Sequence, residues 1–341
     1  MEFPLKTEAL VSHTPGGEFL MTPIIIQDLR PDEVLVEMKY SGICHTDFLV
    51  RHSLLPSLLS LPAIAGHEGA GIIRALGSNI HNKTLQVGDA VLLSFTACGR
   101  CAGCHTDTNY SRCAAFEPCN LTAIRRPDGT TPATLLDGTP VRSQWFGQSS
   151  FARLSVVHEN CVVKCLYPED LGVYAPMGCG YQTGAGTVLN VLKPGPDQTL
   201  VVFGAGSVGF AAIMAAATVP VKQIIAVDIV EQRLELAREL GATHTINSAE
   251  IEGSVVDEVM RLTGNRGVDF AIDATGRSKV IELMMNCLAY GGAAAVVGVP
   301  PRMEKIELSI GVFFARKNTC ICVVEGDAHP PEVVIKSIIE F

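Results

Sequence analysis

Three residues that prefer soft divalent metals lie far apart in the sequence, each beside or close to a glycine. They are Cys44, His67 and Cys179. Two thiolates and one imidazole make three protein ligands for zinc, and three ligands leave the fourth tetrahedral position open. A single cysteine is more often a small buried apolar residue. The three together predict a catalytic zinc site whose ligands come from separate loops.

A second cluster holds four cysteines in one short stretch, namely Cys98, Cys101, Cys104 and Cys113. Four thiolates can fill a tetrahedral shell completely, which is typical of a structural zinc. Disulfides are the alternative. The sequence begins Met1-Glu2-Phe3-Pro4 and lacks the pattern of a secretory signal there. We therefore expect a reducing, cytoplasmic setting, in which closely spaced cysteines favour metal binding over disulfides.

The composition excludes several classes of partner. The chain has 341 residues, of which 48% are hydrophobic and 18% charged, with a formal net charge of −9. This negative charge argues against nucleic acid or an anionic membrane surface as the main partner. No apolar run reaches the roughly 18 residues that a membrane span needs. The length predicts two domains.

The pattern of elements changes along the chain. The first half reads as short strands separated by glycine and proline turns, with strands expected at 34–38, 71–73 and 90–93. From Leu200 onward, buried strands alternate with helices, which predicts a doubly wound parallel sheet and an α/β fold. The expected strands are 200–203, 224–227, 244–246, 268–272 and 293–297, and the expected helices run to 218 and over 231–240, 252–263 and 277–288.

A glycine-rich turn connects the first of these strands to its helix. Gly204, Gly206 and Gly209 have the spacing that lets backbone approach a pyrophosphate at a helix N-terminus. Asp228 follows at the end of the next strand, where a carboxylate accepts the ribose hydroxyls of NAD and repels the 2′-phosphate of NADP. Arg233 is the one nearby cation expected to soften that repulsion. The alternative without a cofactor role is that Asp228 is a solvated turn residue at the end of the strand.

These features resemble the zinc-dependent medium-chain alcohol dehydrogenases, and 146–151 (FGQSSF) and 179–184 (CGYQTG) are most similar to the aryl- and benzyl-alcohol dehydrogenases. The resemblance implies a GroES-like β-barrel catalytic domain at 1–180, a Rossmann NAD-binding domain at 181–321, and a return to the catalytic domain at 322–341. It also implies an active site between the two domains and a homodimer or homotetramer.

The same resemblance implies roles for individual residues. Thr46 would take the alcohol proton, Asp47 would orient His67, and Glu68 would lie beside the metal. The expected cofactor contacts are His45, Thr183, Gly204, Gly206, Val208, Gly209, Asp228, Arg233, Val297 and Val299.

The resemblance implies reversible oxidation of a primary alcohol, aromatic or allylic, to an aldehyde with hydride transfer to NAD. The alternatives are a zinc-free quinone or enoyl reductase on the same scaffold, and a non-catalytic relative that keeps the fold.

Three departures from the family pattern bear on this expectation. Leu49 stands where many members have a relay histidine, and eight residues rather than seven separate Cys104 from Cys113. In the family, further strands follow the segment that resembles 322–341. We therefore expect a shortened return to the catalytic domain and weak activity or stability of the 341-residue chain.

Overall fold

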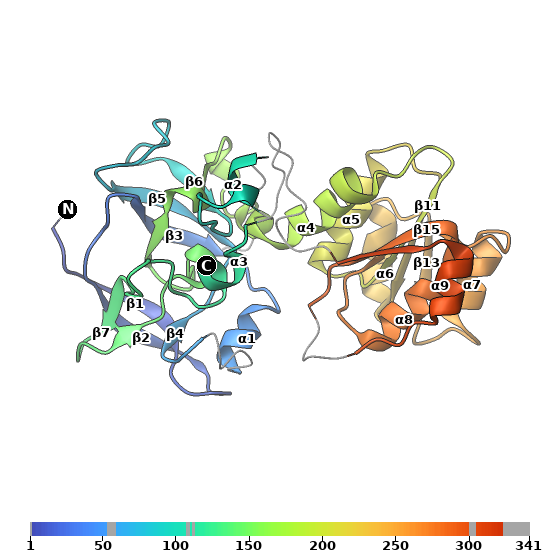
Figure 1. Ribbon diagram of the computed structural model, residues 1–341, viewed down its shortest axis with the longest axis horizontal. Coiled ribbons are helices and arrows are strands. Elements are labelled where there is room, and N and C mark those ends of the chain that lie inside the picture. Colours follow the sequence, from blue (N-terminus) through green and yellow to red (C-terminus); the bar gives the residue numbers. More distant parts are fainter. Residues whose placement is uncertain (1, 53–58, 107–109, 111–112, 300–304, 323–341) are drawn as a thin grey trace. The chain divides into compact units, whose positions relative to one another are not determined.

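The computed structural model describes residues 2–52, 59–106, 110, 113–299 and 305–322 (Figure 1). These residues form two compact units, one extending to Cys179 and the other beginning at Gly180. The segment 323–341, which includes nearly all of the expected return to the catalytic domain, lies outside the described residues.

The first unit is built on two antiparallel sheets of five strands each, with the orders β4-β1-β2-β7-β8 and β10-β6-β5-β3-β9. Alternation along β3 explains why the second sheet is covered on both sides: Val34 and Val36 face one apolar cluster, and Leu35 faces another. The strands are β1 Leu5–Ser12, β2 Phe19–Ile26, β3 Glu33–Ser41, β4 Ala63–Ile64, β5 Gly69–Leu76, β6 Ala90–Leu93, β7 Ala133–Leu135, β8 Pro140–Val141, β9 Leu154–His158 and β10 Val162–Lys164.

Short helices carry the chain between these strands and around the cysteine-rich segment. They are α1 Asp47–Arg51, α2 Ala102–Thr106 and α3 Phe116–Asn120, with shorter turns η2 Trp145–Gly147, η3 Glu159–Cys161, η4 Pro168–Asp170 and η5 Ala175–Gly178. Cys44 lies between β3 and α1, His67 lies between β4 and β5, and Cys179 follows η5. Strand ends therefore position Cys44 and His67, and the end of η5 positions Cys179.

The second unit is a parallel six-stranded sheet with the order β13-β12-β11-β14-β15-β16. Strands β12 and β14 flank β11. The chain runs from β11 through β12 to β13 at one edge of the sheet, and then from β14 through β15 to β16 at the other edge. Ligands of such sheets bind beyond the carboxyl ends of the strands at this switch point. The strands are β11 Thr199–Phe203, β12 Gln223–Asp228, β13 His244–Asn247, β14 Val268–Asp273, β15 Leu288–Val296 and β16 Thr319–Cys322.

Helices of the second unit mostly connect successive strands, as the alternating pattern predicts. They are α4 Gly180–Gly186, η6 Thr187–Leu192, α5 Ser207–Ala217, α6 Glu231–Glu239, α7 Val255–Leu262, α8 Ser278–Asn286 and α9 Ile310–Arg316.

Two expected helices are shorter at one end by more than one residue than the sequence pattern predicts. α7 begins at Val255 rather than at 252, because the Ser254 hydroxyl caps it by accepting the Val256 N–H at 3.1 Å. α8 ends at Asn286 rather than at 288, because Leu288 already pairs with Val268 in the sheet. Both differences are end effects that a local capping bond or a distant strand partner decides.

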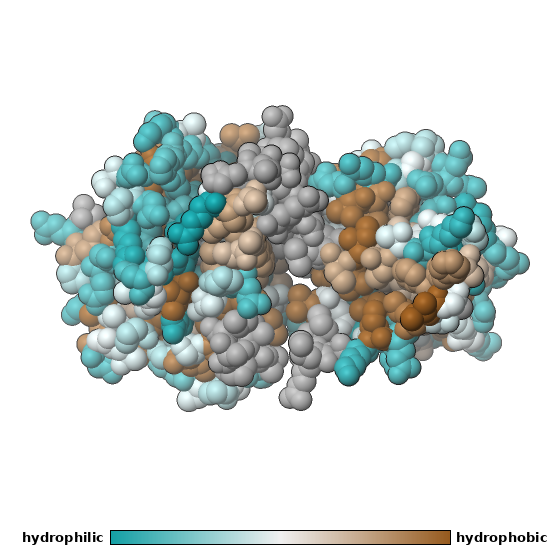
Figure 2. Space-filling view, viewed as in Figure 1, coloured by the Kyte–Doolittle hydropathy of each residue, from teal (hydrophilic) through white to brown (hydrophobic). Residues whose placement is uncertain are grey.

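Exposed apolar side chains gather around α9 on the face seen in Figure 2. Ile310 is 83% exposed and Phe314 is 84% exposed. Exposed apolar patches of this kind are typical of protein interaction surfaces. The predicted homodimer or homotetramer stays a prediction. Among the described residues, no helix is long and apolar enough to cross a membrane.

Candidate metal and cofactor sites

The first unit brings Cys44, His67 and Cys179 together. Their ligand atoms all lie within 4.8 Å of one another, and the two Sγ atoms are 3.9 Å apart. His67 is fully buried, while both cysteines are half-buried. A triad of two sulfurs and one nitrogen at this spacing has the donor set and the size of an open zinc site.

The Asp47 carboxylate orders this triad from behind. Its Oδ1 lies 2.8 Å from His67 Nδ1 and accepts the Gly66 N–H at 2.9 Å. Its Oδ2 accepts the Cys44 N–H at 3.1 Å. One buried carboxylate therefore fixes the histidine ring and the backbone of two ligand loops, and metal-binding histidines commonly donate their other ring N–H to a carboxylate in this way.

The remaining histidine nitrogen is the test of whether the triad fits a metal. His67 Nε2 is buried and has no hydrogen-bond partner within the described part of the chain. A buried polar atom without a partner is costly, so its pairing with a metal ion would remove that cost. Burial disfavours the imidazolium, but Asp47 and Cys44 outweigh it and hold the pKa of His67 well above its usual range. The unpartnered Nε2, the two sulfurs and the negative charge that Asp47 and Cys44 bring to the site fit a zinc cation, which would bind the neutral imidazole in place of a proton.

Cys44 itself is an acidic thiol. Contact with Cys179 is the largest cause that holds the pKa of Cys44 well below its usual range, opposed by burial and aided by His67. Thr46 Oγ1 lies 3.6 Å from Cys44 Sγ. The thiolate is the form that binds zinc, so this environment prepares Cys44 for coordination.

Two residues for which the sequence predicts no role, Phe146 and Gln148, also contact His67. Phe146 stacks on the His67 ring with centroids 4.7 Å apart and an interplanar angle of 27°. Gln148 is fully buried and donates from Nε2 to the His67 carbonyl at 2.8 Å. Nothing local in the sequence signals these contacts, because each partner is about 80 residues away. Phe146 also has an unusual backbone conformation, with φ of 48°, of a kind that clusters at functional sites.

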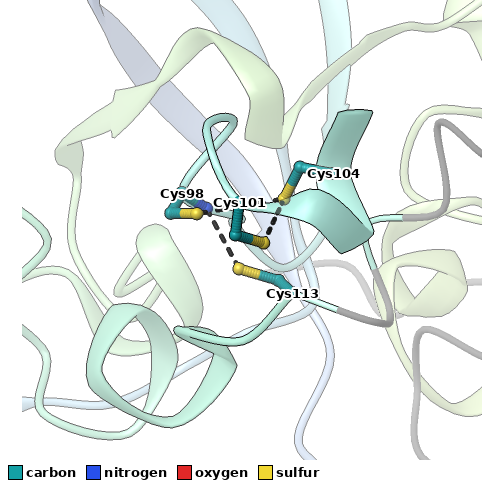
Figure 3. Close-up of side chains that lie close together, drawn as sticks. All are labelled: Cys98, Cys101, Cys104 and Cys113. Atoms are coloured by element: carbon teal, nitrogen blue, oxygen red, sulfur yellow. Dashed lines mark hydrogen bonds between the residues drawn. The ribbon is translucent and has the colours of Figure 1, made fainter. Parts of the chain in front are cut away.

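The four cysteines of the second cluster also converge, with their side chains pointing toward one another (Figure 3). Cys101 and Cys104 sulfurs are 3.5 Å apart, and Cys98 and Cys104 sulfurs are 3.9 Å apart. The Cys98 N–H donates to Cys113 Sγ at 3.3 Å. The extra residue before Cys113 therefore does not prevent the fourth sulfur from joining the set.

The protonation preferences of this cluster differ among its members. Backbone N–H groups, the Ala114 N–H first, lower the pKa of Cys101 to about 6. Burial raises the pKa of Cys104 to about 12. Cys119, a further cysteine six residues after Cys113, lies outside the cluster, and burial raises its pKa. Four mutually close sulfurs with bonds from backbone N–H groups fit a closed, structural zinc site.

The glycine turn of the second unit has the predicted geometry. Gly204 has a φ of +92°, which side-chain-bearing residues rarely adopt, and a Cβ on Gly209 would lie 1.9 Å from the Gly204 carbonyl oxygen. A Cβ on Gly206 would meet nothing within 4 Å, so backbone at this point faces open space. The turn leads into α5, whose N-terminus supplies free N–H groups for a phosphate.

Asp228 lies at the carboxyl end of β12 and is 7% exposed. It is a structured residue rather than a solvated one, because its Oδ2 accepts the Ala205 N–H at 2.7 Å and its Oδ1 accepts the Ile229 N–H at 2.8 Å. The half-exposed Arg233 lies 3.8 Å from Asp228 Oδ2. A carboxylate is thus held against the glycine turn, where the resemblance places the adenosine ribose.

The other predicted cofactor residues are distributed over both units. Val297 continues from β15 and donates its N–H to the Asp273 carbonyl at 2.9 Å, and Val299 is 44% exposed. Thr183 is buried on α4, and Val208 is half-buried on α5. His45 is exposed beside Cys44.

Glu68 is buried directly after His67. A Cβ on Gly42 would lie 1.8 Å from its Oε2, so only glycine leaves room for this carboxylate. The close approach of Gly42 is therefore part of how the Cys44 and His67 loops pack.

Comparison with known proteins supports one family. Residues 30–167 match the alcohol dehydrogenase GroES-like domain, and residues 207–337 match the zinc-binding dehydrogenase domain. A geraniol dehydrogenase from Castellaniella defragrans is 35% identical over 332 residues, which are 97% of this chain and 86% of that protein. The chain belongs to the zinc-dependent medium-chain alcohol dehydrogenase family.

Solved structures of similar dehydrogenases agree with this assignment. A benzyl alcohol dehydrogenase from Acinetobacter calcoaceticus is 38% identical with a TM-score of 0.87, and the match covers 95% of this chain and 85% of that one. An alcohol dehydrogenase zinc-binding domain protein from Burkholderia ambifaria is 40% identical with a TM-score of 0.89 and the same coverage. The predicted GroES-like and Rossmann fold, the alcohol dehydrogenase assignment, and the use of zinc and NAD are confirmed at the level of the family.

Proposed function

We propose that this dehydrogenase reversibly oxidises a primary aromatic or allylic alcohol to its aldehyde, using NAD. The similar proteins support this class, because benzyl alcohol is an aromatic primary alcohol and geraniol is an allylic one. In both compounds the carbinol carbon is bonded to an unsaturated carbon. The shared substrate feature is therefore an alcohol whose aldehyde product is conjugated.

The observation that carries the proposal is the triad with its unpartnered nitrogen. Cys44, His67 and Cys179 would hold the catalytic zinc, with His67 Nε2 as the nitrogen ligand. Zinc, when bound, lowers the pKa of the alcohol at its open position, and NAD accepts the hydride. Asp47 holds His67 in the tautomer that presents Nε2 to the metal, because Nδ1 is engaged with the carboxylate.

Thr46 would take the alcohol proton. Its hydroxyl lies 3.6 Å from Cys44 Sγ, and the residue is half-buried. Thr46 therefore lies beside the three metal ligands and is partly open to solvent, which can receive the proton. Leu49 cannot continue a proton relay, and His52 is exposed and stacks on Phe48 with centroids 6.3 Å apart. We infer that Thr46 passes the proton outward without a histidine relay.

The second unit would bind NAD through the glycine turn and Asp228. The backbone at Gly206 has the space for a pyrophosphate, and the start of α5 provides N–H donors. The Asp228 carboxylate would accept the ribose hydroxyls and repel the additional phosphate of NADP. Arg233, which lies 3.8 Å from Asp228 Oδ2, is half-exposed and offsets this repulsion only weakly.

One experiment separates this proposal from its alternatives. Zinc per chain and alcohol-dependent NADH formation are measured on the same preparation of wild type, Cys44→Ser and the control Cys119→Ser, whose thiol lies outside both clusters. We expect two zinc ions and benzyl alcohol oxidation in wild type and in the control, and one zinc without oxidation in Cys44→Ser. Reduction of a quinone or an enone with no bound zinc would favour the reductase alternative. Two zinc ions with no oxidation of any alcohol would favour the non-catalytic alternative.

A further inference from the structure

The side chain of Gln148 uses all of its amide hydrogens inside the first unit. Nε2 donates to the His67 carbonyl at 2.8 Å and to the Ser94 carbonyl at 3.2 Å, and Oε1 accepts the Gly69 N–H at 2.9 Å. The side chain is fully buried. Two of its three partners, His67 and Gly69, therefore belong to the His67 loop and the start of β5, and the third, Ser94, directly follows β6.

Ser94 extends this connection to a second ligand. Its hydroxyl donates to the Gly178 carbonyl at 3.2 Å, directly before Cys179. A Cβ on Gly178 would lie 2.0 Å from the Leu93 carbonyl oxygen, so the Cys179 loop packs directly on the end of β6. One amide thus links the His67 loop to the strand end that supports Cys179.

The backbone around Gln148 is fixed by its own contacts. Phe146 and Ser149 have φ values of 48° and 49°, which cost free energy and persist only where the surrounding structure enforces them. The Ser149 hydroxyl donates to the Ile64 carbonyl at 2.7 Å and accepts the Trp145 N–H at 2.8 Å. The Ser155 hydroxyl donates to the Gln148 carbonyl. The turn therefore holds Gln148 in one place, and the side chain transmits that placement to the ligand loops.

We propose that Gln148 is a positioning residue of the open metal site, which sets the distance between His67 and Cys179. It is not a ligand, because its polar atoms are engaged by the backbone of the ligand loops. The inference rests on the proposed metal set and adds the residue that fixes its geometry. A side chain with this role should control how long the open site retains its metal.

The matched control is Gln144, a second fully buried glutamine four residues earlier. Its amide contacts the Arg125 N–H at 3.1 Å and Glu33 at 3.4 Å, and none of its contacts in the described chain reaches a metal-ligand loop. Gln148→Met and Gln144→Met each remove a buried amide while keeping a similar shape. A general loss of stability would affect both variants, whereas loss of positioning would affect Gln148→Met alone.

The experiment measures zinc release to a chromophoric chelator, together with melting temperature and the absorption spectrum of Co²⁺ placed in the open site. We expect the fast phase of release to accelerate about 10- to 100-fold in Gln148→Met, with an altered Co²⁺ spectrum. The slow phase, from the four-cysteine site, should keep its rate, and Gln144→Met should release both ions as wild type does.

Three results would contradict the inference. The first is a fast phase of unchanged rate in Gln148→Met, and the second is equal acceleration in both variants. If Gln148→Met does not fold, Ser94→Ala tests the same connection, because it removes the hydroxyl that donates to Gly178 and keeps the Ser94 carbonyl that accepts from Gln148. Unchanged release and spectrum there would be the third. A wild-type chain without a rapidly released zinc would contradict the proposed function itself. The three results above contradict only the role of Gln148, because in each of them wild type still releases one zinc rapidly.

Discussion

Replacing Asp47 with asparagine should weaken the open metal site while the fold persists. The carboxylate accepts three hydrogen bonds, from His67, Gly66 and Cys44, and is 1% exposed. Asparagine keeps the size, and its oxygen can still accept from His67 and Gly66. Its NH₂ group then faces the Cys44 N–H, so two donors meet and neither has an acceptor.

The structure gives the size of the effect. A buried donor left without a partner costs about 1–3 kcal/mol, and the bond to His67 also loses its charged acceptor. Since about 1.4 kcal/mol corresponds to a tenfold change, we expect zinc affinity at the open site to fall roughly 10- to 100-fold.

The assay is competition for zinc with a chelator of known affinity, alongside chemical unfolding. The control is Asp273→Asn in the second unit, where an equally buried carboxylate accepts the Thr275 and Gly276 N–H groups at 3.0 Å. Asp273→Asn should lower stability but leave zinc affinity unchanged. Equal zinc affinities in Asp47→Asn and wild type would refute the view that this carboxylate orders the triad.

Three further outcomes are expected. A chelator should remove one zinc per chain well before the other, because the open site has a free position and the four-cysteine site does not, and simultaneous removal would contradict this. Asp228→Ala should weaken NAD binding by about 1.5–3 kcal/mol and relieve the exclusion of NADP, as titration of both cofactors can show, whereas equal use of both by wild type would contradict the role of this carboxylate. Bonds from the Asn82 and His81 N–H groups outweigh burial and lower the pKa of Glu159. The ionised Glu159 carboxylate should therefore stabilise the fold above the ordinary carboxyl pKa of 4.5, and this stabilisation should be lost as pH falls below it. The free energies of unfolding of wild type and Glu159→Gln should then converge in acid. A constant difference between them across pH would contradict this.

The sequence predicts the second unit well because its signals are local. Buried strands, glycine spacing and the strand-end position of Asp228 are all readable within short windows, and five of the six strands of the parallel sheet, all but β16, follow from their alternation. Helix ends at 254 and 287 were less predictable. A serine cap decides one, and pairing of Leu288 with a strand 20 residues earlier decides the other.

The metal sites divide in the same way. The four cysteines lie within 16 residues, and the open triad is predicted from the residue types of Cys44, His67 and Cys179 together with their glycine neighbours. The contacts that shape the triad are long-range: Gln148 reaches His67 and Ser94, and Phe146 stacks on His67. No periodicity or spacing encodes such contacts, because they depend on how the sheets of the first unit place β6 and the turn at 146–149.

The most direct test of the central claim is NADH formation from benzyl alcohol while zinc is returned to protein from which only the more labile ion has been removed. We assign that ion to Cys44, His67 and Cys179. Activity should rise in proportion to added zinc and stop rising at one ion per chain, with no such recovery in Cys44→Ser. Activity that is the same before and after zinc is returned would contradict this assignment.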